Sequence, residues 1–233
     1  MRPYEPYRGR VWRVIEGQYR PATRKITDSN AEQARLEELL EATKPRVPPE
    51  CRHLDYQFST PFRYGLYPWM SRFRRPGPTD GVYYASEHSI TAAIEEAWGK
   101  VTFFRNSPGT PLPGNPLDRN AIEATVAAPV SIDLTHPAME DPAWRDPDDY
   151  SATCDLADDV RAEGCELIRY ASVRDPGNGL NVAILTCVAF NDPAPVALET
   201  WKIFLRPDHV ILSNETAREV REYGIAETAF EHV

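Results

Sequence analysis

The order of β-prone and helix-forming segments in this 233-residue chain predicts an α+β fold, with a mixed, largely antiparallel sheet and flanking helices. The β-prone runs gather late in the chain, whereas a doubly wound fold alternates strands with helices. No GxGxxG follows a strand, so the phosphate-binding turn of a classical dinucleotide-binding domain is missing. At this length we expect one domain over residues 1–233.

The first fifty residues predict one strand and one helix. Residues 11–15, VWRVI, have the composition of a strand. A helix is expected to begin at Ser29, because Ser29 and Glu32 have the spacing of a capping box. The apolar stripe of this helix consists of Leu36, Leu39 and Leu40. We expect residues 1–50 to form a helical elaboration that packs against the core.

The remaining elements are expected in the following order. β-Prone runs lie at residues 82–85, 101–104, 121–127, 130–134, 165–170, 182–190, 200–205 and 210–212. Helices are predicted between residues 89 and 100, over 156–162, and beyond residue 214. Pro129 is expected to separate 121–127 from 130–134, because proline cannot donate a backbone hydrogen bond to a sheet. Pro193 and Pro195 mark a turn between antiparallel strands.

The charge distribution argues against general nucleic-acid binding. The formal net charge is −9, and acidic residues crowd residues 139–166. Arginines crowd the first 25 residues and residues 63–75 instead. An acidic body with one local basic patch fits a small anionic ligand better than a nucleic-acid backbone.

Cysteines and histidines show no metal-binding spacing. There is no CxxC, HxxxH or HExxH motif, so no metal site is predicted. The N-terminus, MRPYEPYRGR, has no apolar signal core, and no run approaches the length that spans a membrane. We therefore expect a cytoplasmic protein in which the cysteines are reduced thiols. These cysteines are Cys51, Cys154, Cys165 and Cys187.

Residues 61–100 hold the densest set of anion-binding and aromatic groups. Within thirteen residues, aromatic side chains alternate with Arg63, Arg72, Arg74 and Arg75. Guanidinium groups bind phosphate oxygens bidentately and stack on rings. Tyr84 follows on a predicted strand, and Glu95 follows eleven residues later on a predicted helix. The set suits a dinucleotide such as NAD, although a solvated arginine loop with core tyrosines gives the same pattern.

Two blocks resemble a known family. The pattern SRFRR…GVYYASEHSITAAIEE, followed by GCELIRYASVRDPGNGLNVAIL, is similar to the RES domain, which is named for an Arg, a Glu and a Ser. The resemblance covers roughly residues 11–213. It implies a fold like that of ADP-ribosyltransferase toxins. Its members are toxins of bacterial RES–Xre toxin–antitoxin pairs, and they degrade NAD by phosphorolysis or hydrolysis or, in some cases, ADP-ribosylate a protein.

The resemblance assigns roles to individual residues. Arg72, together with Arg63, would clamp the pyrophosphate of NAD. Tyr84 would border the nicotinamide ribose, and Glu95 would bond the ribose hydroxyls and stabilise positive charge at the anomeric carbon. Ser172 would fix a ribose or phosphate group. Further ligand contacts are expected from Tyr64, Arg74, Arg174 and Asn181.

Several assignments stay open at the level of sequence. The first arginine of the family follows an aromatic residue in a strand, and both Arg13 and Arg63 fit this description; Arg63 is preferred because it stands closer to SRFRR. Ser151 is a rival to Ser172, and Asp155 stands where many members have glutamine. The acceptor of ADP-ribose is phosphate, water or a protein side chain, and a nearby arginine, Arg74 or Arg174, would favour phosphate.

Three functional hypotheses follow. The first is an NAD-consuming RES toxin that cleaves the nicotinamide–ribose bond and is held by a cognate Xre-type antitoxin, whose segment covers the cleft. The second is an ADP-ribosyltransferase that modifies a host protein. The third is a non-catalytic binding module that retains the fold. None of them requires a metal, a membrane or direct contact with nucleic acid.

Overall fold

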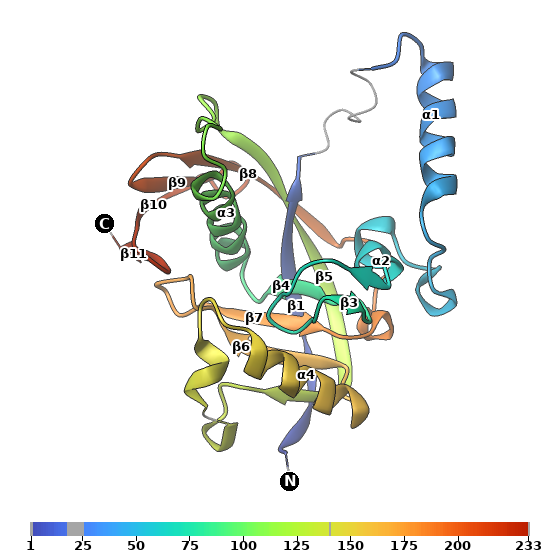
Figure 1. Cartoon of the computed structure of the whole chain (residues 1–233), viewed down its shortest axis with the longest axis vertical. Coiled ribbons are helices and arrows are strands. Elements are labelled where there is room, and N and C mark those ends of the chain that lie inside the picture. Colours follow the sequence, from blue (N-terminus) through green and yellow to red (C-terminus); the bar gives the residue numbers. More distant parts are fainter. Residues whose placement is uncertain (1, 18–25, 140, 233) are drawn as a thin grey trace.

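The structure is a computed structural model that describes residues 2–17, 26–139 and 141–232. Its centre is a nine-stranded sheet in the order β1-β4-β7-β6-β5-β8-β9-β10-β11, and β1 also pairs with β5. All neighbouring strands are antiparallel except β5 and β6 (Figure 1). The predicted α+β fold with a largely antiparallel sheet is therefore confirmed. The strands are β1 (Tyr4–Glu16), β4 (Tyr83–Ser86), β5 (Leu117–Asp133), β6 (Leu167–Ala171), β7 (Leu180–Ile184), β8 (Ala197–Leu205), β9 (His209–Asn214), β10 (Glu219–Ile225) and β11 (Phe230–His232).

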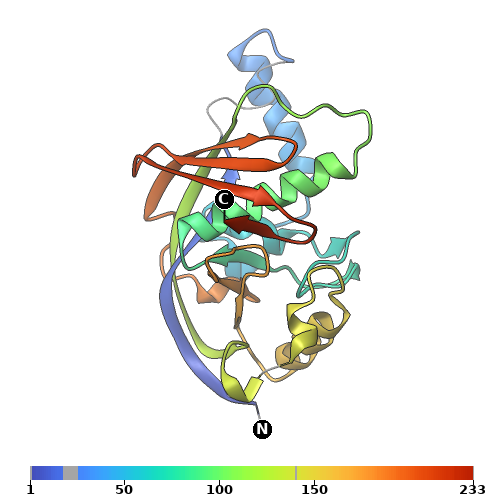
Figure 2. The same ribbon diagram turned by 90° about the vertical axis from the view of Figure 1, so that its left-hand side faces the viewer.

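Four α-helices and a small hairpin complete the described part of the chain. The helices are α1 (Asn30–Thr43), α2 (Tyr56–Arg63), α3 (Ser89–Arg105) and α4 (Ser151–Ala162), and the hairpin pairs β2 (Leu66–Tyr67) with β3 (Gly77–Pro78). Four 3-10 helices are η2 (Pro49–Cys51), η3 (Pro137–Met139), η4 (Pro142–Arg145) and η5 (Cys187–Ala189). Figure 2 shows the long, curved strands β1 and β5 on one side of the molecule and α3 and α4 on the other. The site described below lies between these sides.

Strand β5 runs without interruption through Pro129, so the predicted break is wrong. Ala128 pairs with Tyr7 and Ser131 pairs with Glu5, and the register shifts between Glu5 and Tyr7. Proline is tolerated where the ladder is irregular, because the missing N–H costs no hydrogen bond there. The irregularity absorbs Pro129, and β5 continues as one strand of 17 residues.

Two further segments differ from the sequence prediction. Residues 101–104 belong to α3, because Val101 continues a buried face that begins with Ile94 and Trp98. This face packs against the inner side of β8 and β9. The tail beyond residue 214 forms β10 and β11 instead of a helix, and Tyr223 and Phe230 join the same core. Burial in this shared core therefore decides the structure of both segments.

Helix α1 has the predicted start but not the predicted packing. Ser29 Oγ accepts a hydrogen bond from the Glu32 N–H at 3.1 Å, as the capping spacing indicated. No residue of α1 is buried, however, and Leu39 remains 49% exposed. Figure 1 shows α1 standing beside the body of the molecule. Glutamates flank the leucines, so the helix keeps most of its surface in water, and only β1 of the N-terminal piece is part of the sheet.

The cysteines also differ from expectation. Cys51 of η2 and Cys187 of η5 form a disulfide, although 136 residues separate them in the sequence. Cys154 and Cys165 are free thiols, and both are buried. The prediction that all four are reduced is therefore wrong for one pair. Within residues 2–17, 26–139 and 141–232, no helix is long and apolar enough to cross a membrane.

Candidate functional site

A cleft of about 390 Å³ opens where β1, β4, α3 and the β6–β7 loop meet. Its walls come from segments that are far apart in the sequence, so the fold and not one motif assembles it. We call it the Glu95 cleft. The lining residues with chemical potential are Arg13, Arg72, Tyr84, Glu95, Tyr150, Tyr170, Arg174 and Asn181.

The Glu95 carboxylate is oriented by two side-chain donors. Its Oε1 accepts hydrogen bonds from Ser172 Oγ and from Asn181 Nδ2, each at 2.7 Å. Oε2 accepts no hydrogen bond from any described residue. Ala92, one turn earlier on α3, lines the same cleft and is small enough to leave room beside the carboxylate. The structure thus brings together Glu95, Ser172 and Asn181, three of the residues that the sequence placed in the site.

The two donors have fixed hydrogen directions. Ser172 Oγ accepts from the backbone N–H groups of Arg174 and Asp175, at 3.2 and 3.0 Å, so its own proton is left for Glu95. Asn181 Oδ1 accepts from Ser86 Oγ at 2.6 Å, and this turns the amide NH₂ toward Glu95. Because each donor is itself held by another group, the carboxylate has one preferred orientation.

The loop that carries Ser172 is fastened to the start of α3. Thr91 Oγ1 donates to Asp175 Oδ2 at 2.8 Å, and Gly177 N–H donates to Asp175 Oδ1 at 2.7 Å. Gly179 packs closely on this pair: a Cβ at this position would lie 2.2 Å from both Asp175 Oδ2 and Thr91 Oγ1. Only glycine permits this approach, which places Ser172 within reach of Glu95.

Tyrosine rings form the apolar side of the cleft. The Tyr84 hydroxyl bonds with Ser71 Oγ at 3.0 Å and accepts from the Phe73 N–H at 2.9 Å. Burial raises the pKa of Tyr84 to about 12, so the phenol is neutral at physiological pH. Burial, followed by the nearby Glu95 charge, also raises the pKa of Tyr170 well above its usual value. Both rings therefore offer uncharged surfaces beside the Glu95 carboxylate.

Arg72 is fixed at the edge of the cleft. Its Nη1 donates to the Trp144 carbonyl at 2.8 Å and its Nη2 donates to the Asp146 carbonyl at 3.0 Å. The guanidinium also lies 4.8 Å from the centre of the Tyr150 ring. These contacts hold the positive charge in place and leave little freedom for the side chain.

Arg13 enters the cleft from β1. Its guanidinium lies 4.6 Å from the centre of the Tyr83 ring. Its Nη1 is buried and makes no hydrogen bond with any described residue. Leaving a buried charged donor unpaired costs about 1–3 kcal/mol or more.

Comparison with known protein families identifies the domain that contains most of the cleft. The model of the RES domain matches residues 46–206, which is more than half of the chain. The chain belongs to the RES domain family. No curated protein matches it. The matched region contains Arg72, Tyr84, Glu95 and Ser172, whereas β1 with Arg13 lies outside it.

The secondary structure corrects the preference for Arg63 as the strand arginine. Arg63 ends helix α2, so the expectation that it lies in a strand is wrong. Its side chain bonds the Pro45 carbonyl and pairs with Glu41 Oε1 at 2.7 Å, outside the Glu95 cleft. Arg13 is the arginine that follows an aromatic residue, lies in a strand and lines the cleft.

Other predicted ligand contacts also lie outside the cleft. Tyr64 follows α2 and is 37% exposed. Arg74 donates to the Tyr64 carbonyl and to Thr79 and lies 4.4 Å from the centre of the Tyr67 ring, so it ties the β2–β3 hairpin together. Arg75 is paired with two carboxylates of α4. The arginine-rich segment therefore sends only Arg72 into the site.

The two open alternatives on α4 do not reach the cleft either. Ser151 is exposed, and its N–H donates to Asp149 Oδ1 at 2.8 Å. Asp155 pairs with Arg75. Tyr150, directly before Ser151, is the residue of this segment that lines the cleft.

Sequence reasoning missed Tyr170 as a site residue. It lies two positions before Ser172 at the end of β6, so strand alternation sends both side chains to the same face. The two-residue spacing between Tyr170 and Ser172 could have indicated that Tyr170 also lies in the site. Arg174, by contrast, was predicted and does line the cleft, although its guanidinium already bonds the Thr228 and Pro147 carbonyls.

Ligands for a metal do not gather in this RES domain. In the parts of the chain that the structure describes, no group of three or more His, Cys, Asp or Glu side chains is arranged to hold a metal ion. The chemistry of the Glu95 cleft therefore has to be argued from its carboxylate, guanidinium and hydroxyl groups.

Proposed function

We propose that this RES-domain protein cleaves the nicotinamide–ribose bond of NAD and passes ADP-ribose to phosphate or water. One observation carries the proposal: a carboxylate, oriented by Ser172 and Asn181, lies in a cleft that Arg13 and Arg72 also line. A carboxylate is what a sugar cation needs, and guanidinium groups are what a pyrophosphate needs.

The bond-breaking step develops positive charge on the ribose. The C1′–N1 bond breaks and its electron pair passes to nicotinamide, which changes from a pyridinium cation to a neutral leaving group. The ribose becomes oxocarbenium-like, as in glycoside cleavage. Glu95, held through Oε1, keeps Oε2 for the ribose hydroxyls and for the charge at C1′. An oxygen of phosphate or water then adds to C1′.

The guanidinium groups supply binding and alignment. Arg13 adds a positive charge to the wall of the cleft, where it attracts the anionic pyrophosphate. Arg72 contributes a second fixed charge at the edge of the cleft. Positioning of this kind converts binding energy into a reactive geometry. Tyr84, which is neutral, borders the nicotinamide ribose.

The biological setting follows the family. RES proteins are linked to toxin–antitoxin systems, so we propose an NAD-consuming toxin that a cognate Xre-type antitoxin restrains by covering the Glu95 cleft. The chain alone should then arrest a bacterial host, and co-expression with the product of the neighbouring gene should relieve the arrest. Harmless expression, with no Xre-like neighbour, would remove the toxin part of the proposal.

Nicotinamide release from NAD tests the reaction. Purified protein is incubated with NAD in the presence and absence of phosphate. Release that depends on phosphate identifies phosphorolysis, and release without it identifies hydrolysis. ADP-ribose found on a protein identifies transfer. If NAD is neither bound nor cleaved, the proposed function is wrong.

A further inference from the structure

A second cavity, of about 430 Å³, lies next to the Glu95 cleft and has no role in the bond-breaking step. Its walls come from the region after β5, from η4 and from the end of β6. We call it the Trp144 cavity. It is lined by Leu134, Asp141, Pro142, Trp144, Arg145 and Tyr170, with Ala171.

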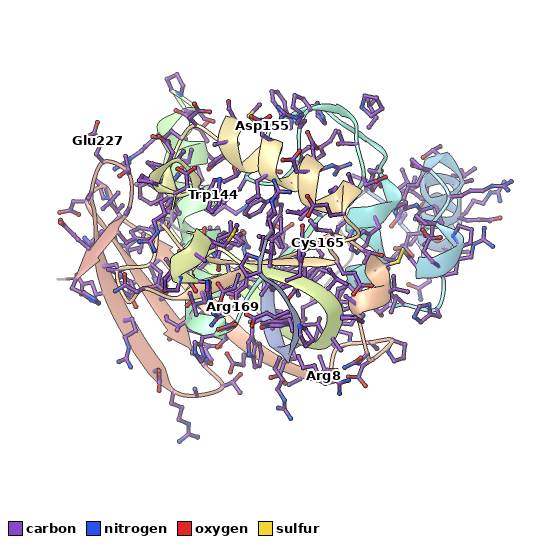
Figure 3. All side chains as sticks on the ribbon, turned by 90° about the horizontal axis from the view of Figure 1, so that it is seen from below. Arg8, Trp144, Asp155, Cys165, Arg169 and Glu227 are labelled. Atoms are coloured by element: carbon purple, nitrogen blue, oxygen red, sulfur yellow. A yellow bond between two sulfur atoms is a disulfide. The ribbon has the colours of Figure 1, made fainter. Side chains whose placement is uncertain are left out.

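The two cavities meet at a small number of residues. Tyr170 lines both of them. Arg72, from the Glu95 cleft, donates to the carbonyl of Trp144, whose side chain lines the second cavity. In the view of Figure 3, Trp144 lies between Asp155 of α4 and Arg169 of β6. Arg72 and Tyr170 therefore form the boundary between the two spaces.

The composition of the Trp144 cavity suits a flat heteroaromatic group. Leu134 and Pro142 supply apolar contacts, and the half-buried Trp144 packs on the core through part of its ring system. Asp141 and Arg145 add polar groups that are exposed at the rim. Stacking of a nucleobase on an aromatic side chain contributes about 1–3 kcal/mol.

The order of the chemical groups in NAD indicates which of them would occupy the Trp144 cavity. In NAD the pyrophosphate lies between the nicotinamide ribose and the adenosine. If Glu95 faces the nicotinamide ribose and Arg72 the pyrophosphate, the adenosine continues past Arg72. Beyond Arg72 lies the Trp144 cavity. Resting on the proposed function, we infer that the Trp144 cavity binds the adenine base of NAD, with the base against the Trp144 ring.

Fragments of the dinucleotide separate this inference from a general effect on the site. NAD, nicotinamide mononucleotide and AMP are titrated by calorimetry into Glu95→Gln protein, which binds without turnover, and into the same protein with Trp144→Leu. We expect NAD and AMP to bind about 5- to 150-fold more weakly after Trp144→Leu, the range that the stacking energy gives. Nicotinamide mononucleotide, which lacks the adenosine half, should change less than about 2-fold.

Two further variants control for folding. Trp144→Phe keeps an aromatic face and should recover most of the loss. Trp69→Leu removes a tryptophan that is 71% exposed and lines neither cavity, and it should leave all three affinities unchanged. Thermal unfolding of each variant confirms that the fold is retained.

The outcomes are distinguishable. An equal loss for NAD and nicotinamide mononucleotide would mean that Trp144 acts on the Glu95 cleft through Arg72, and the inference would be overturned. Unchanged binding of NAD and AMP would overturn it as well. A wild-type protein that neither binds NAD nor releases nicotinamide would instead refute the proposed function on which the inference rests.

Discussion

Two groups of arginines in this molecule differ in where their side chains lie and in what they contact. Arg63, Arg74 and Arg75 are close in the sequence, yet each is engaged locally: with Glu41 and Pro45, with the β2–β3 hairpin, and with α4. The arginines of the Glu95 cleft come from three distant segments. They are Arg13, Arg72 and Arg174.

The difference shows what makes a cationic site. A run of arginines in sequence is a property of one segment, and neighbouring carbonyls and carboxylates can satisfy it. The cleft gathers its charges through the sheet, which brings β1 beside β4 and places the β6–β7 loop near α3. Arg13 keeps a buried donor without a partner among the described residues, and none of the three loop arginines does so. Site residues are thus recognised by their convergence on one cleft from distant segments.

The largest effect in the cleft should come from its carboxylate. Glu95→Gln preserves the shape and removes the charge that opposes the ribose cation. We expect nicotinamide release from NAD to fall at least about 100-fold, the scale of losing one transition-state electrostatic partner. Single-turnover rates and thermal unfolding measure chemistry and folding separately.

The control for this variant has to be chosen from the structure. Glu96 points elsewhere on α3, but it pairs with the buried Arg119 at 2.7 Å and contributes to the cleft wall, so Glu96→Gln would disturb the fold. Glu227 is exposed on the turn before β11, and Glu227→Gln is the matched control. Near-normal turnover by a folded Glu95→Gln protein would exclude Glu95 from the mechanism.

The second effect compares two arginines on one strand. Arg13→Lys keeps the positive charge and loses the planar fork, whereas Arg8→Lys makes the same change at an exposed position of β1. We expect NAD to bind Arg13→Lys more weakly by about 1.5–3 kcal/mol, the net value of a hydrogen bond to a charged group. Arg8→Lys should stay within about 0.5 kcal/mol. Calorimetric titration in the Glu95→Gln background gives both values, and equal affinities would remove Arg13 from the site.

The fold class could be predicted from the sequence because it depends on local pattern. Late clustering of strands gave the antiparallel α+β architecture, and Ser29 with Glu32 gave the start of α1. What failed depends on tertiary contacts. Pro129 was expected to end a strand, but a register shift in its partner accommodates it. The pairing of Cys51 with Cys187 has no local signal at all.

The site could be predicted in part for the same reason. Glu95, Ser172 and Asn181 lie in blocks whose spacing is characteristic of RES domains, and the structure brings them together. The choice between Arg13 and Arg63 could not be made, because both follow an aromatic residue and only the strand pairing of β1 distinguishes them.

A third effect concerns the neutral tyrosine of the cleft. Burial raises the pKa of Tyr84 from 10.0 to about 12, so folding favours its protonated form. This stability is fully present below pH 10 and is lost as pH rises through about 12. Between these values the free energy of unfolding of wild type should fall more than that of Tyr84→Phe, by at most about 2 kcal/mol. Urea unfolding at several pH values measures it, and parallel pH profiles would contradict it.

The smallest effect on NAD affinity should come from an arginine outside the Glu95 cleft. Arg63→Lys retains a charge for Glu41 and loses the contact with the Pro45 carbonyl, both outside the Glu95 cleft. If only the arginines that line the cleft bind the pyrophosphate, NAD affinity should change by less than about 0.5 kcal/mol, in the same titration that detects Arg13→Lys. Thermal stability should fall slightly, because Arg63 ties the segment after α1 to α2. A loss of affinity as large as that of Arg13→Lys would mean that this loop reaches the ligand, and the division between loop and cleft arginines would no longer hold.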